Sequence, residues 1–142
     1  MASAADLILA APSEASSIVA SDYPLGVYKG VNVDGLDPLK LAALHALFVQ
    51  RPFSDLLREY QPIAQASPAG PWLVRLPQEL LILLGKIAPP DQPSAAASWS
   101  ETDQAQEEAW SPEEADRFLS RIIPFAQTAA FEGKDLYLWI YS

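Results

Sequence analysis

The sequence contains no cysteine and one histidine among its 142 residues. Without cysteine the chain has neither a disulfide framework nor a thiolate metal site, which favours a reducing compartment. A metal site built from several histidines is excluded by the same counts. We therefore expect no metal and no other cofactor.

Long hydrophobic runs and basic residues are also scarce. The longest uninterrupted apolar run, 136–141, is far shorter than the ~20 residues that a membrane-spanning helix needs. The first residues lack the basic start and the apolar core of a signal peptide. Nine basic residues oppose eighteen acidic ones, and the net charge of −9 repels nucleic-acid backbones and anionic lipids. These features predict a cytoplasmic protein that binds neither nucleic acid nor membranes.

The length fits a single globular domain, residues 1–142, which is large enough to form a core without covalent cross-links. One stretch, 88–98 (APPDQPSAAAS), is rich in proline and alanine. Because its prolines interrupt regular structure, we expect a flexible loop there. The stretch is too short to separate two domains.

The clearest local pattern, residues 35–60, predicts a helical hairpin. Asp37 is a suitable N-cap, and Pro38 fits the first helical position because its missing N–H would have no partner there. Apolar residues follow at the three-and-four spacing of one helical face, until Pro52 ends the run. Ser54 is the predicted cap of a second, shorter helix.

The remaining elements are predicted from caps and alternation. We expect short helices over 3–11 and 13–20, strands over 25–33 and 72–76, and a buried helix that starts at Pro77. Ser111 and Glu114 form a capping box for a helix that ends at Gly133, with a kink at Pro124.

The last strand, 136–141, is apolar on both faces, which predicts a position inside a sheet. The fold class is therefore α+β: a small, mostly antiparallel sheet of about three strands, covered by several helices. Tyr137, Trp139 and Tyr141 share one face of this strand and are candidates for a homodimer contact.

His45, the sole histidine, lies on the apolar face of the predicted helix at Pro38. It is either a core histidine bonded through one ring nitrogen, or a general base. As a base it would act with Asp34 or Asp37 in a small hydrolase or ligand-binding enzyme. No G-x-S-x-G motif supplies a nucleophile for such an enzyme.

Eight of the eighteen acidic residues lie between Lys86 and Arg117, with no basic residue among them. Such a stretch is either a solvated surface or a docking surface for a basic protein. Two tryptophans flank it, and aromatic anchors among carboxylates are typical of interfaces, although both could instead anchor a helix to the core. The docking hypothesis assigns the contact to Trp99, Asp103, Glu107, Glu108, Trp110, Glu113 and Glu114.

Two segments resemble the YfbM-like family of uncharacterised small bacterial proteins. They are LDPLKLAALHALFVQRPF (36–53) and FAQTAAFEGKDLYLWIYS (125–142), about a quarter of the chain. The first is similar to that family's helix with a Leu-His pair, and the second to its closing helix, glycine turn and final strand. The resemblance implies an α+β fold in a bacterial protein and provides no active-site residues.

We therefore interpret the sequence as that of a non-enzymatic, acidic protein-binding module. By analogy with other small acidic bacterial proteins, it could be immunity-like and neutralise a basic partner. The alternative remains an enzyme that uses His45 with Asp34 or Asp37.

Overall fold

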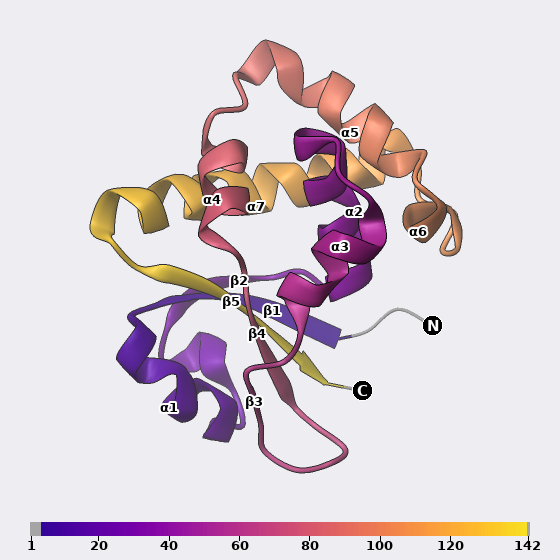
Figure 1. Ribbon diagram of the computed structural model, residues 1–142. Coiled ribbons are helices and arrows are strands. Elements are labelled where there is room, and N and C mark those ends of the chain that lie inside the picture. Colours follow the sequence, from indigo (N-terminus) through magenta and orange to yellow (C-terminus); the bar gives the residue numbers. More distant parts are fainter. Residues whose placement is uncertain (1–3, 142) are drawn as a thin grey trace.

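The computed structural model describes residues 4–141, which form one antiparallel sheet with helices on both faces. The order of the strands is β2-β1-β5-β4-β3 (Figure 1). Their bounds are β1 Ala4–Ala10, β2 Lys29–Asn32, β3 Ala64–Gln65, β4 Trp72–Arg75 and β5 Asp135–Tyr141. The class is α+β, and five strands in the described residues replace the three expected.

Seven α-helices connect the strands of this described part. They are α1 Ala15–Ala20, α2 Pro38–Val49, α3 Phe53–Leu57, α4 Gln78–Gly85, α5 Gln92–Ser100, α6 Asp103–Gln106 and α7 Pro112–Glu132. None of the helices within 4–141 is both long enough and apolar enough to cross a membrane.

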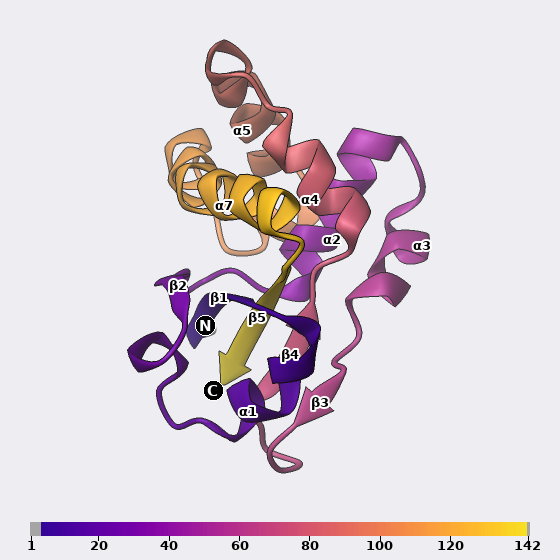
Figure 2. The ribbon, with the colours of Figure 1, turned by 90° about the vertical axis from the view of Figure 1, so that its left-hand side faces the viewer.

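The two faces of the sheet are buried against different layers. Helices α2, α4, α5 and α7 cover one face, and α1 covers the other (Figure 2). Along β5, Leu136 and Leu138 point to the larger helical layer, whereas Tyr137 and Trp139 point to α1. This explains why the last strand is apolar on both faces, and its central position confirms that prediction.

Helix α2 begins where its capping signal predicts, and α7 both begins and ends where its signals predict. The Asp37 side chain accepts from the backbone N–H of Lys40 at the start of α2. Ser111 and Glu114 form the predicted capping box of α7. Gly133 ends α7 in the left-handed region at φ 66°, where a residue with a Cβ would be strained.

The predicted helix over 3–11 is wrong, because residues 4–10 form β1; Ser3, its predicted cap, lies outside the described residues. The weak helix signal from alanine and serine is overridden because β1 pairs with both β2 and β5. Residues 5–10 are buried on both faces of the sheet. An Ala-rich, nearly continuous apolar run is therefore a central strand here.

The expected loop over 88–98 is also wrong. A 3₁₀ turn, Pro89–Asp91, leads directly into α5. Its prolines and Pro93 occupy first-turn positions, where a missing N–H costs no hydrogen bond. The signals that predicted a break in structure are start signals for helical turns.

Two boundaries differ as well. Pro52, rather than Ser54, is the N-cap residue of α3, and no side chain caps that helix. The predicted strand over 25–33 is shortened to β2, because Pro24–Gly26 form a 3₁₀ turn.

Candidate functional site

His45 is fully buried on α2. Its Nδ1 lies 2.9 Å from the hydroxyl of Tyr60, and its Nε2 lies 2.6 Å from a carboxylate oxygen of Glu79. With the ring proton on Nε2, the imidazole donates to Glu79 and accepts from Tyr60, so both nitrogens are satisfied. Burial, helped by Glu59 and Glu79, raises the pKa of Tyr60 well above its ordinary value, so the hydroxyl remains a donor.

The structure does not bring His45 together with the two predicted carboxylates. Asp34 accepts hydrogen bonds from the backbone N–H of Ala5 and from the Asn32 amide. Asp37 caps α2 and binds Lys40. The predicted alternative site is therefore not assembled, and the imidazole is a core group that connects α2 to Tyr60 and to α4.

Lys40 is the centre of a second buried polar network, with only 2% of its surface exposed. Its Nζ lies 2.7 Å from Asp37 Oδ2, 2.8 Å from Glu108 Oε1 and 5.4 Å from the centre of the Trp110 ring. Burial alone would lower the pKa of Lys40, but the hydrogen bonds to Asp37 and Glu108 outweigh it and raise the pKa. Glu108, predicted to face a partner, is thus bound within the chain.

Trp99 and Trp110 belong to the core, as the second reading of the sequence allowed. They are 0% and 5% exposed, and their rings lie 5.1 Å apart in an edge-to-face arrangement. Trp110 also stacks on Phe118 of α7, and the Trp99 indole donates to the carbonyl of Lys40. Neither ring is available as an interface anchor.

The remaining acidic residues of the stretch divide into two groups. Glu114 is used in the capping box of α7, and Asp116 accepts from Gln92 on α5. Five carboxylates are exposed and form no ion pair within residues 4–141: Asp91, Glu101, Asp103, Glu107 and Glu113. Across the same residues, no group of three Asp, Glu or His side chains is placed to hold a metal ion.

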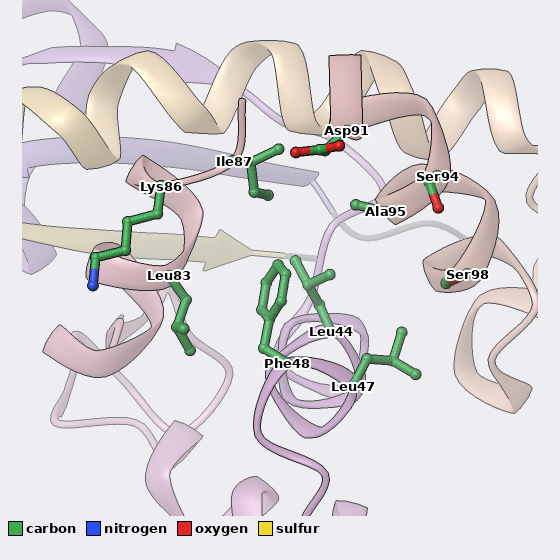
Figure 3. A pocket seen from close by; sticks show the side chains of 10 residues that line it. All are labelled: Leu44, Leu47, Phe48, Leu83, Lys86, Ile87, Asp91, Ser94, Ala95 and Ser98. Carbon is green, nitrogen blue, oxygen red and sulfur yellow. The ribbon is translucent and has the colours of Figure 1, made fainter. Parts of the chain in front are cut away.

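An apolar groove of about 430 Å³ lies between α2, α4 and α5. Figure 3 shows Leu44 and Phe48 of α2 between side chains from the other two helices. Its other lining residues are Leu47, Leu83, Lys86, Ile87, Asp91, Ser94, Ala95 and Ser98. The groove thus has an apolar floor and a polar rim, a shape that suits the apolar face of a helix.

A second hollow lies on the other side of Leu47, near the start of α6. Glu101 and Asp103 line it together with Arg51, which already faces Glu59 at 4.0 Å. Leu47 lines both openings and is 42% exposed. An apolar ridge therefore separates an apolar groove from a hollow that carries two free carboxylates.

Glu113 lies elsewhere, in a hollow between α5 and the start of α7 with Asp116 and Arg117. The acidic stretch is therefore distributed over several faces and does not form one continuous surface. Of its seven predicted contact residues, Asp103 alone lines either opening beside Leu47.

The aromatic face proposed for a homodimer is largely covered by α1. Tyr137 and Trp139 are 0% and 4% exposed, whereas Tyr141, at the end of β5, is 41% exposed. Only Tyr141 of these three is open to a partner.

The groove was not predicted, because its walls come from helices far apart in the sequence. The sequence does contain one feature that is related to the groove. Leu47 lies outside the stripe of Leu41, Leu44 and Phe48, so it is a large apolar residue off the core-facing side of α2. A single exposed apolar side chain does not by itself identify a contact surface. The apolar lining residues Leu44 and Phe48 occupy core-facing positions, and polar ones such as Lys86 resemble ordinary surface residues.

Comparison of the chain with protein-family models, with curated proteins and with solved structures found no match.

Proposed function

We propose that the protein is a binding module for a basic amphipathic helix of a partner protein. The apolar side of that helix lies in the groove between α2, α4 and α5, and its lysines or arginines face Asp91, Glu101 and Asp103. The observation that carries this proposal is the position of exposed Leu47 between an apolar groove and two unpaired carboxylates.

The physical basis is a combination of burial and charge. Filling the groove removes Leu47, Phe48 and Leu83 from water, at roughly 25 cal/mol per Å² of apolar surface. The carboxylates add little affinity at an exposed rim, but they favour cationic partners and raise the association rate. The chain's net charge of −9 acts in the same direction. Neutralisation of a basic protein in an immunity-like role is consistent with such binding.

The test uses designed peptides as probes. The first is a fluorescent 18-residue helix of Leu, Ala and Lys with leucines on one face. The second has the same composition in scrambled order, and the third carries Glu in place of Lys. We expect fluorescence anisotropy to show about tenfold tighter binding of the first peptide than of either control, a difference of about 1.4 kcal/mol.

Two matched pairs of variants test the location. Leu47→Glu places a charge on the ridge and should weaken binding about tenfold, whereas Ile82→Glu, at a 48% exposed site outside the groove, should not. The double variant Glu101→Gln with Asp103→Asn should bind the peptide with a smaller salt dependence than the unmodified protein. The control, Glu107→Gln with Glu113→Gln, should keep a larger salt dependence than that variant. Equal effects within either pair would contradict the proposed surface.

A further inference from the structure

A separate hollow of about 270 Å³ lies on the opposite face of the sheet, where the end of α1 approaches β5 and the β3–β4 hairpin. Figure 2 shows α1 on this side, away from the larger helical layer. The lining residues are Val19, Ala20, Ser21, Asp22, Ala66, Pro71, Trp139 and Tyr141. None of them takes part in the groove described above.

Trp139, which lines this hollow, carries a hydrogen-bond donor that has no partner among the described residues. Its side chain is 96% buried, and its Nε1 is the one buried side-chain polar atom in residues 4–141 without a partner. Asp6, directly opposite it in the β1–β5 register, instead accepts a hydrogen bond from Asn32. Buried donors in native proteins are nearly always paired, so this N–H calls for an acceptor oxygen.

Two other groups at the hollow favour a cation. Asp22 is exposed, and no basic side chain in the described part of the chain pairs with it. The rings of Tyr141 and Trp139 lie 4.7 Å apart at a 51° tilt, and Tyr141 presents much of its surface to solvent. A carboxylate beside an aromatic ring is a suitable site for an organic ammonium group.

We propose that this hollow binds a small organic ammonium compound that carries an oxygen close to its charged nitrogen. The ammonium group lies between the Asp22 carboxylate and the Tyr141 ring, and the oxygen accepts the Trp139 N–H. Because Nε1 is covered, the side chains around it shift as the ligand enters. This site is independent of the helix-binding groove.

The experiment compares choline with 3,3-dimethyl-1-butanol, its uncharged isostere, by NMR of the four tryptophan indole N–H groups in the ¹⁵N-labelled full chain. We expect choline to shift the Trp139 signal with a Kd of about 1 mM. The Trp99 signal, whose N–H donates to the Lys40 carbonyl, should not move. The isostere should bind at least about fivefold more weakly, because it lacks the charge that Asp22 recognises.

Asp22→Asn should weaken choline binding at least about fivefold, whereas Asp55→Asn, at an exposed carboxylate on α3, should leave it unchanged. Equal shifts from choline and its isostere would overturn the proposal. So would a Trp139 signal that stays in place at saturating choline, or equal effects of the two substitutions.

Discussion

Burial disfavours the charged form of Lys40, whereas its two neighbouring carboxylates favour it. The ammonium is stable inside the protein because Asp37 and Glu108 both bind it. We expect Lys40→Met to lower the free energy of unfolding by about 3 kcal/mol, because it leaves two partly buried carboxylates without a cation.

Urea denaturation measures this loss. Lys29→Met, at an exposed lysine on the edge strand β2, is the control and should change stability by less than about 0.5 kcal/mol. A similar cost for both substitutions would show that the Lys40 network does not stabilise the fold.

The hydrogen bond between His45 and Tyr60 allows a double-mutant test of its structural role. His45→Leu leaves the buried Tyr60 hydroxyl without its partner, and Tyr60→Phe removes a donor to the imidazole. The double variant should lose less stability than the sum of the single losses, with a coupling of about 1 kcal/mol. Additive losses, measured by urea denaturation, would contradict the direct contact.

Asp6 makes stability depend on pH. Burial is the main cause of its raised pKa, with a further contribution from Asp34 that opposes the lowering effect of Asn32. Because the folded-state pKa is above that of the unfolded chain, its stabilising contribution is fully present below the unfolded-state value of about 3.9 and is lost as pH rises through the folded value. The change in stability caused by Asp6→Asn should therefore be more favourable at pH 7 than at pH 4.

The unfolding midpoints of the two proteins at these pH values measure this difference. If the midpoints of the two proteins differ by the same amount at pH 4 and at pH 7, the proposed effect of Asp6 is wrong.

At the scale of elements, the capping box of α7 and the start of α3 offer a matched comparison. Ser111→Ala removes the side chain that accepts from the Glu114 N–H and should cost about 1 kcal/mol. Ser54→Ala should cost less than about 0.5 kcal/mol, because no side chain caps α3. Thermal unfolding of both variants measures the difference, and a larger loss for Ser54→Ala would contradict these assignments.

The same elements show what could be predicted from the sequence. Helices α2 and α7 carry local signals, Asp37-Pro38 and Ser111 with Glu114, which act within one turn and need no tertiary information. Strand β1 carries no such signal: its conformation is set by pairing with β5, more than a hundred residues later. In the 88–98 segment the prolines predict a break in regular structure, whereas the fold places them in the first turns of helical segments.

The surroundings of His45 and the groove likewise depend on tertiary contacts that the sequence alone does not reveal. The burial of His45 was one of two readings open from its apolar face, but Tyr60 and Glu79 could not be identified as its partners. The groove also depends on how α2, α4 and α5 pack together. Residues that lie on one face of one helix are predictable, whereas contacts between helices require the fold.

Over the chain as a whole, the acidic side chains are divided between the fold and the surface. Some of them stabilise the fold: Glu108 binds Lys40, and Glu114 caps α7. Others, such as Glu101 and Asp103, face solvent beside an apolar groove. The net charge of −9 therefore combines structural carboxylates with those that we propose for partner binding.

The most direct test of the proposed function is chemical-shift mapping of the leucine–lysine helix on the ¹⁵N-labelled protein. The proposal predicts shifts concentrated on α2, α4 and α5, centred on Leu47, with the α1 face of the sheet unchanged. Shifts spread evenly over exposed carboxylates, or centred on Glu113 at the start of α7, would contradict it.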